Sequence, residues 1–580
     1  MRILLLALGL ALTLPAAHAQ TPVWTDAVQP TDSRPTDGTG ALGRGITVDA
    51  AGNQYVTGVL NNSGGSGAPA VRVFGSTTFA GGSGLASGFI AKLSPTQQWQ
   101  WALRATSDGE GATFQESAVS PAGDTYGVGL VFGDANMTTG GTTLTVGTYT
   151  YTTTKYFASF ITRLNASGQP QWLAGVSGAQ IYSSGWDATA GNLVVAGTYS
   201  GTVTVGATTL PTAPSTGGLF VARLNAAGQW VSAVGVPNTG TASTSRFVVS
   251  KVAVGPQGQA AIAFRIRNGS ITLGSTTINS ISTTQAISVV AQLNAANQWT
   301  WATQTPAAGS GSVAYVPSGL QYDRAGNIWL AAEAPSTDAI QLGSATVTDA
   351  SFTARLSSAG QWSALGTIGR PSSISNPYVA ALAVDGQGNP VILGSLPGTG
   401  TFTFGSRSVT NTASNSNFVA RYNPTTTAWD YAQLTPAAGG DGYSFEAAAI
   451  DGAGTLTATG MLRGSATFGF TTLTNAAANG NNVFVARLSG AGLITAVRQA
   501  VGLAPLTVYP NPAGAGAATL RLPVAATAAR PLLLRDALGR VVRQATIQAG
   551  QQEIPLPTAG LRPGMYVAET SLHRAQIVIE

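Results

Sequence analysis

The segment Phe-Val-Ala-Arg-Leu-Asn-Ala-Ala-Gly-Gln-Trp at residues 220–230 has six related copies in the chain, which begin at Phe89, Phe160, Val289, Phe352, Phe418 and Phe484. A second segment, Asp-Ala-Ala-Gly-Asn-Gln-Tyr-Val-Thr-Gly at 49–58, also occurs seven times, with central glycines Gly52, Gly123, Gly191, Gly258, Gly326, Gly388 and Gly454. These glycines are 62 to 71 residues apart. Two markers that return in one order at a nearly fixed spacing indicate an array of seven similar units.

Each unit has the pattern of an antiparallel meander of four strands. In the first unit, strands at 45–49 and 54–58 flank a tight turn in which Asp49 accepts local backbone hydrogen bonds and Gly52 takes a positive φ. The last two strands of a unit, such as 220–224 and 229–234, flank Asn-Ala-Ala-Gly, a type I turn closed by a glycine bulge. A short hairpin lies between the two pairs of strands, for example at 203–210, 271–278, 340–347 and 402–409.

One four-stranded unit cannot bury both of its faces, whereas units stacked around an axis can, and they leave only short edges. The sequence therefore predicts an all-β protein, with a seven-bladed β-propeller over residues 20–502 and a small C-terminal domain. An open β-solenoid is the alternative, but its repeats are shorter. The units resemble bacterial propeller repeats of the SBBP and NHL-like kinds, which occur in proteins with unrelated roles.

An additional strand precedes the first unit. Residues 23–27 resemble the tryptophan-containing outer strands at 98–102 and 298–302, whereas the seventh unit has Leu493-Ile-Thr-Ala-Val497 in that position. We therefore expect the N-terminal strand to complete or extend the last blade and so close the ring.

Composition excludes several classes of function. The net charge of +5 comes from basic residues scattered over the units, whereas nucleic-acid binding needs a concentrated basic face. The chain has no cysteine, which excludes disulfides and thiolate metal sites, and its two histidines, His18 and His573, lie outside 20–502. The usual general base and the commonest metal ligand are thus absent from the repeats, and we expect neither a metal nor a cofactor.

The N-terminus has the features of a secretory signal peptide over residues 1–19. Arg2 supplies the positive charge, residues 3–14 are apolar but too short to span a bilayer, and Ala17-His18-Ala19 fits the cleavage pattern. No other segment has an apolar run long enough for a membrane helix, so we expect no transmembrane anchor.

The repeats stop before residue 506, and short strands with turns over 506–580 predict a small β-sandwich. Three motifs follow in order: Tyr509-Pro-Asn-Pro512, Asp536-Ala-Leu-Gly-Arg540 and Leu561-Arg-Pro-Gly-Met-Tyr566. This block resembles the type A C-terminal sorting domain of the bacterial type IX secretion system, although the chain ends in glutamate where many members have lysine. The resemblance implies that Tyr509, Pro510, Asn511, Pro512, Asp536, Gly539, Gly564 and Tyr566 form the sorting motif. It also implies the secretion machinery as partner, and export to the cell surface or the medium.

Charged residues recur at two positions of the repeat. The turn position holds Asp49, Ser120, Asp187, Gly255, Asp323, Asp385 and Asp451, and a strand position holds Lys92, Arg163, Arg223, Gln292, Arg355, Arg421 and Arg487. Both positions lie on one rim, so a salt bridge in most blades is one interpretation and independent solvated charges are the other. Asp124 is a nearby substitute where unit two has Ser120.

Six units carry an aromatic residue 9–11 positions before the turn glycine: Phe114, Tyr182, Phe247, Tyr315, Tyr378 and Phe445. These rings could form a ligand-binding funnel that stacks on sugars or holds a peptide, or they could fill the space between blades.

Two groups of acidic residues, Asp108, Glu110 and Glu116, and Asp441 with Glu446, could serve glycoside hydrolysis, but we expect them to be solvated loop charges.

The sequence contains no nucleophile elbow, phosphate loop or dinucleotide fingerprint. It thus predicts a secreted or surface-attached, non-enzymatic binding or adhesion protein whose ligand is a glycan, a peptide or a surface protein. A propeller enzyme acting on extracellular polysaccharide and a purely structural surface-layer component are the alternatives.

Overall fold

The computed structural model describes residues 22–32, 40–61, 71–79, 86–133, 141–240, 246–280, 286–305, 307–308, 315–334, 339–348, 350–435, 438–439, 442–475, 480–492, 504–505, 507–514, 518–522, 524–526, 530–536, 541–556, 558–570 and 573–580. All regular structure in these residues is strand and turn. The chain divides into two compact units, Met1–Ile494 and Thr495–Glu580. The predicted signal peptide lies outside the described residues.

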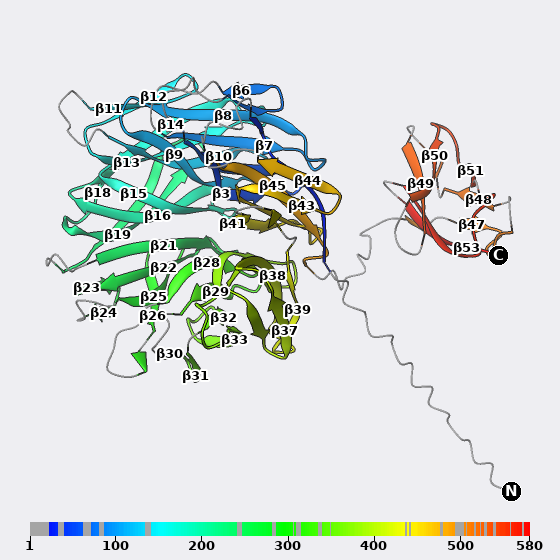
Figure 1. The fold of residues 1–580 in the computed structure, drawn as a ribbon. Coiled ribbons are helices and arrows are strands. Elements are labelled where there is room, and N and C mark those ends of the chain that lie inside the picture. Colours follow the sequence, from blue (N-terminus) through cyan, green and yellow to red (C-terminus); the bar gives the residue numbers. More distant parts are fainter. Residues whose placement is uncertain are drawn as a thin grey trace, which may run out of the picture. The chain divides into compact units, whose positions relative to one another are not determined.

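Seven antiparallel blades of four strands each form the first unit, and in blades 1 and 5 a hairpin extends the sheet to six strands. Figure 1 shows the strands of these blades. From the inner to the outer strand, blade 1 is β3 (Gly40–Val48), β4 (Gln54–Asn61), β7 (Ser87–Leu93) and β8 (Trp99–Ser107). Blade 2 is β9 (Gly111–Val119), β10 (Thr125–Phe132), β13 (Phe157–Leu164) and β14 (Pro170–Ser177). Blade 3 is β15 (Ala179–Asp187), β16 (Asn192–Gly201), β19 (Ala213–Asn225) and β20 (Trp230–Pro237).

The remaining blades repeat this order. Blade 4 is β21 (Arg246–Val254), β22 (Ala260–Arg267), β25 (Ile287–Leu293) and β26 (Trp299–Gln304). Blade 5 is β28 (Val316–Tyr322), β29 (Ile328–Glu333), β32 (Ser351–Leu356) and β33 (Trp362–Gly369). Blade 6 is β34 (Tyr378–Val384), β35 (Pro390–Pro397), β38 (Asn415–Asn423) and β39 (Ala428–Leu434). Blade 7 is β41 (Tyr443–Ile450), β42 (Leu456–Leu462), β45 (Asn482–Ser489) and β1 (Val23–Val28).

Each inner strand contacts the inner strands of both adjacent blades, and β41 of blade 7 contacts β3 of blade 1. The first unit is therefore a closed seven-bladed β-propeller. Its local pattern follows the sequence, because all seven turn glycines from Gly52 to Gly454 have φ between 67° and 85°. Asp49 accepts hydrogen bonds from the backbone N–H of Ala51 and Asn53 at 2.9 Å, as an aspartate in such a turn does.

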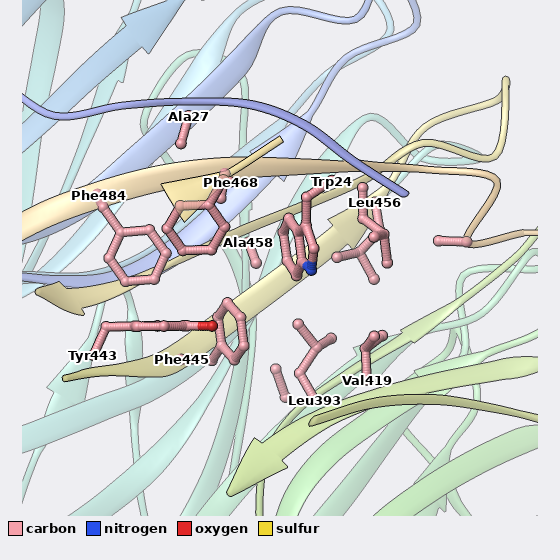
Figure 2. Close-up of a cluster of buried hydrophobic side chains, with 14 of the residues drawn as sticks. Trp24, Ala27, Leu393, Val419, Tyr443, Phe445, Leu456, Ala458, Phe468 and Phe484 are labelled. Carbon is pink, nitrogen blue, oxygen red and sulfur yellow. The ribbon is translucent and has the colours of Figure 1, made fainter. Parts of the chain in front are cut away.

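The N-terminal strand closes the ring. Strand β1 pairs antiparallel with β45 and supplies the outer strand of blade 7, as the sequence predicts. Trp24 of β1 is 6% exposed and stacks on Phe445 of the inner strand, with ring centroids 5.8 Å apart. Figure 2 shows this ring beside Phe468, in one core with Tyr443 and Phe484. Trp24 and Phe445 are far apart in the sequence but share one hydrophobic core. The ring therefore closes only when the two ends of the propeller segment meet.

A hairpin lies beside the outer part of each blade, in the connection between the second and third strands. In chain order these hairpins are β5 (Arg72–Phe74) with β6 (Thr77–Phe79), β11 (Thr142–Val146) with β12 (Tyr149–Thr153), β17 (Thr204–Val205) with β18 (Thr208–Thr209), β23 (Gly269–Leu273) with β24 (Thr276–Ser280), β30 (Ala339–Leu342) with β31 (Ala345–Val347), β36 (Gly400–Phe404) with β37 (Arg407–Asn411), and β43 (Gly464–Phe468) with β44 (Thr471–Asn475). Short strands β2 (Thr31–Asp32), β27 (Ala307–Ala308) and β40 (Ala438–Gly439) extend three of them. Since β11 pairs with β8 and β36 with β33, two hairpins cover the outer edge of the preceding blade.

The second unit is a small sandwich of two sheets. One sheet contains, in order, β46 (Ala504–Pro505), β53 (His573–Ile579), β52 (Gly564–Glu569), β49 (Arg530–Asp536) and β50 (Val541–Ile547). The other contains β47 (Thr507–Tyr509), β48 (Ala518–Arg521) and β51 (Glu553–Leu556). Both sheets contribute to one buried core that includes Leu520, Leu534 and Ile577. This is the sandwich that the sequence predicts for this block.

Candidate functional site

Every inner strand of the propeller carries one β-bulge, where the register against the second strand shifts by a residue. The extra residues are Arg44, Gln115, Tyr182, Ser250, Ser318, Ala380 and Glu446. In six blades the extra residue is eight positions before the turn glycine, and in blade 3, whose turn is one residue longer, it is nine. A bulge changes the direction of a side chain, so the seven bulges form a ring of positions around the central channel.

The inner strands enclose a central cavity of about 410 Å³, lined by residues of all seven blades. A second hollow of about 240 Å³ overlaps it at the level of the bulges, away from the Asp-Gly-Asn turns. We call this hollow the channel mouth. Its charged and tyrosine side chains are Arg44, Glu116, Tyr182, Lys251, Glu333, Tyr378 and Glu446. They come from all blades of the ring, so only the closed propeller brings them together.

One carboxylate of the channel mouth is held by partners on two other blades. Glu116 of blade 2 accepts a hydrogen bond from Lys251 Nζ of blade 4 at 3.2 Å through Oε1. Its Oε2 accepts one from the backbone N–H of Ser184 in blade 3 at 2.7 Å. The Glu116 charge is thus compensated and its position fixed.

The other two carboxylates have no such partner. Among the described residues, neither Glu333 nor Glu446 forms an ion pair, and both are partly buried. Burial raises the pKa of Glu333, and it raises the pKa of Glu446 against the opposing charges of Arg44 and Lys251. The pKa of Tyr378 is also raised, first by burial and then by the negative charges of Glu446 and Glu333. The tyrosine therefore lies within the electrostatic influence of both glutamates.

The prediction of a funnel of six aromatic residues is wrong for four of them. Phe114, Phe247, Tyr315 and Phe445 are at most 7% exposed, and each contacts another aromatic ring of its own blade. Only Tyr182 and Tyr378 line the channel mouth, and Tyr378 is 51% exposed.

The physical reason is the strand register. Counted back from the turn glycine, Phe114 and Phe445 are nine residues away, Tyr378 is ten, and Phe247 and Tyr315 are eleven. Side chains in a strand alternate between two faces, so odd and even distances point to different sides. Tyr182, at nine, reaches the channel because it is itself the bulged residue of blade 3.

Two acidic residues expected to be solvated loop charges lie at the channel mouth instead. Glu116 and Glu446 are on inner strands β9 and β41, and they line one hollow although their blades are not adjacent. Asp108 accepts a hydrogen bond from the Thr143 N–H at 2.7 Å, and Glu110 accepts one from the Tyr156 hydroxyl at 2.7 Å. Asp441 lies outside the described residues. The sequence did contain a signal for the two mouth glutamates. Glu116 is seven residues before its turn glycine and Glu446 is eight, which places both at or beside the bulge of the inner strand.

The predicted Asp–Arg pair forms in three blades of the described structure. Arg223 Nη1 is 3.0 Å from Asp187 Oδ2, and Arg421 Nη2 is 2.6 Å from Asp385 Oδ2, with all four side chains buried. Arg163 pairs with Asp124 at 2.8 Å, the substitution expected in unit two. The expectation of a pair in most blades is therefore too broad. Lys92 and Arg355 lie over aromatic rings instead, 5.3 Å and 5.7 Å from the centroids of Tyr55 and Trp329.

The residues of the expected sorting motif lie in the second unit. Asn511 donates to Gln576 O at 2.9 Å and accepts from the Val578 N–H, which ties the Tyr509–Pro512 segment to the last strand. The Tyr566 hydroxyl donates to Arg562 O at 2.8 Å. Pro510 and Pro512 follow cis peptide bonds, Asp536 ends β49 and Gly564 begins β52, whereas Gly539 lies outside the described residues.

In the described part of the chain, no three His, Asp or Glu side chains are arranged to hold a metal ion. The same residues include no helix of the length and apolarity needed to cross a membrane. The channel mouth offers a ligand tyrosine rings, carboxylates and the basic groups of Arg44 and Lys251.

Comparison with known proteins identifies the C-terminal unit. Residues 507–579 match the family described as secretion system C-terminal sorting domain. The chain thus carries a type IX sorting domain, which indicates export to the cell surface or the extracellular space. No curated protein matches the chain.

Several solved structures are similar to this chain at low identity. A protein of unknown function from Dyadobacter fermentans has 10% identity and a TM-score of 0.35, over 80% of this chain and 98% of that chain. A catalytically inactive virginiamycin B lyase from Staphylococcus aureus with quinupristin has 10% identity and a TM-score of 0.33, over 80% of this chain and 99% of that chain. The C-terminal WD40 domain of Sif2 has 9% identity and a TM-score of 0.34, over 80% and 98%.

Proposed function

We propose that this protein is an exported, non-enzymatic binding protein and that its ligand site is the channel mouth. The observation that carries the proposal is the half-exposed ring of Tyr378 in a hollow that also contains Glu333, Glu446 and Arg44. Half-buried charges without an ion-pair partner reduce the stability of a fold, so residues of this kind mark a functional site more often than a structural one.

A binding role agrees with the rest of the molecule. Histidine, the usual general base, is absent from 20–502. The closed ring holds the mouth residues on the inner strands of its blades and, for Glu333, on a second strand, which suits a preformed site. A glycan, a peptide and a surface protein are the ligand classes to be compared.

A polysaccharide-acting propeller enzyme is the second candidate, and one observation favours it. Glu116 and Glu446 line the same hollow, and the raised pKa of Glu446 is what a general acid needs. Against this candidate, Glu116 is neutralised by Lys251 and Ser184 and is not free to act as a nucleophile or base.

The test is an array of glycans and peptides probed with the exported protein and with its Tyr378→Ala and Glu333→Ala variants. We expect selective binding that both substitutions weaken, while Tyr149→Ala, on a hairpin outside the channel, leaves it unchanged. Release of reducing sugar from an array polysaccharide, lost in Glu446→Gln, would favour the enzyme instead. Binding that none of the mouth substitutions alters would overturn the proposal.

A further inference from the structure

The channel mouth is asymmetric in its chemistry. On the side of blades 5 and 6, Tyr378 and Val316 are 51% and 40% exposed, although most of the other apolar residues of these two inner strands are buried. Glu333 ends the second strand of blade 5, opposite Val316 in the β-sheet register. An accessible aromatic face therefore lies beside carboxylates.

The charges of the mouth do not balance. Its lining includes two cations, Arg44 and Lys251, and three carboxylates, Glu116, Glu333 and Glu446. Lys251 is engaged by Glu116, and Arg44 is exposed on the bulge of blade 1, where it acts on Glu446 from beyond ion-pair distance. The part of the hollow around Tyr378 thus has negative charge that no described side chain neutralises by direct contact.

We infer that the hollow around Tyr378, Glu333 and Glu446 holds an organic cation, namely the ammonium or guanidinium group of a lysine or arginine side chain in a peptide. This inference rests on the proposed function and names the ligand class for the same site. A cation over a tyrosine ring gains from the negative face of the ring, and the two carboxylates add direct attraction. A neutral sugar would stack on the ring but leave the partly buried carboxylates uncompensated.

The size of the hollow agrees with a single side chain. Its volume of about 240 Å³ is below the ~300–1,000 Å³ of pockets that enclose drug-sized ligands. The alkyl part of a lysine or arginine would contact Val316 and the Tyr378 ring, as such side chains do on apolar surfaces. An anionic group is disfavoured, because Lys251 is paired with Glu116 and the remaining charged side chains of the lining, Arg44 against Glu333 and Glu446, leave an excess of negative charge.

The experiment compares four small probes on the exported protein by ligand-observed NMR titration. The probes are Nα-acetyl-lysine methylamide and Nα-acetyl-arginine methylamide, with the norleucine analogue as neutral control and the glutamate analogue as anionic control. We expect the two cationic probes to bind. Tyr378→Ala and the Glu333→Gln, Glu446→Gln double variant should each weaken them by about tenfold or more. Tyr149→Ala and Glu110→Gln, outside the mouth, should leave binding unchanged.

The outcomes separate this inference from the proposed function. If the norleucine analogue binds as well as the lysine probe, or if the glutamate variants bind both cationic probes like the parent protein, the cationic class is wrong. The proposed function would survive that result if array ligands of another class still depended on Tyr378. If no probe and no array ligand depends on the mouth residues, both fail.

Discussion

The indole ring of Trp172, on the outer strand of blade 2, lies against Gly228 in the Asn-Ala-Ala-Gly turn of blade 3. Its Nε1–H donates a hydrogen bond to Ala226 O of the same turn at 2.9 Å. Trp101 bonds to Ala166 O in the same way between blades 1 and 2, and Trp301 to Ser358 O between blades 4 and 5, both at 3.0 Å. The repeated glycine and tryptophan thus form one contact that joins neighbouring blades.

Replacement of Gly228 by alanine should destabilise the propeller through this contact. A Cβ there would lie 2.8 Å from Trp172 Cδ2, and the φ of 81° adds backbone strain. Overpacking of this kind costs about 1–3 kcal/mol in the free energy of unfolding. Gly191→Ala is the matched control, because Gly191 also has a positive φ but no atom within 4 Å of its Cβ position. Equal losses in thermal unfolding would show that only backbone strain matters.

The buried ion pair of blade 6 should be far more sensitive to disruption than that of blade 2. Asp385→Ala leaves the fully buried Arg421 with Asp430 as its one anionic partner among the described residues, and breaking such a pair typically costs about 3–5 kcal/mol. Asp124→Ala removes the partly exposed partner of Arg163, for which we expect a loss below about 1 kcal/mol. Denaturant unfolding of the two variants checks this order, and a larger loss for Asp124→Ala would contradict it.

Ring closure by β1 should depend on Trp24. Truncating a buried tryptophan to alanine costs about 3–5 kcal/mol, and here the ring contacts both Phe445 and Phe468. We expect Trp24→Ala to lower the thermal midpoint and to make residues 22–32 the first site of limited proteolysis. Val23→Ala is the control, because Val23 is 59% exposed on the same strand. Cleavage elsewhere with an unchanged midpoint would show that β1 is dispensable.

Replacement of Glu446 and of Glu116 by glutamine should shift the thermal midpoint in opposite directions at pH 7, and the effect at Glu446 should depend on pH. Burial raises the folded-state pKa of Glu446, so its ionised form lowers stability at neutral pH, and this penalty vanishes as the pH falls below the unfolded value near 4.5. Glu446→Gln should therefore raise the thermal midpoint at pH 7 and leave it unchanged at pH 4. Glu116→Gln should lower the midpoint at pH 7, because it weakens the contacts with Lys251 and Ser184. A gain from Glu446→Gln that is equal at both pH values would contradict this explanation.

Export should depend on the second unit. Removal of residues 507–580 should leave the propeller in the periplasm, because this block matches the family of C-terminal sorting domains. Fractionation of cells expressing the full and shortened chains checks this. Appearance of the shortened chain in the medium, without cell lysis, would show a different export route.

The architecture was predictable because its signals are local. Each turn glycine requires a positive φ, and each such glycine recurs at the spacing of one blade. The N-terminal strand was recognisable because Trp24 occupies the place that Trp99 and Trp299 occupy in complete units.

The site was predictable only in part, because it depends on register. No particular residue type marks a bulge such as those at Tyr182 and Glu446. A register shift of one residue moves a side chain from the channel face of the strand to the core face. The pairing of Glu116 with Lys251 joins blades two apart in the ring, so no local pattern contains it.

Hydroxyl-radical footprinting with the strongest array ligand tests the central claim most directly, since it reports where that ligand lies. We predict that the ligand protects Tyr378 from oxidation, while Phe470, a fully exposed ring on the β43–β44 hairpin, is oxidised at the same rate with and without ligand. Unchanged oxidation of Tyr378 at saturating ligand would contradict the assignment of the channel mouth as the binding site.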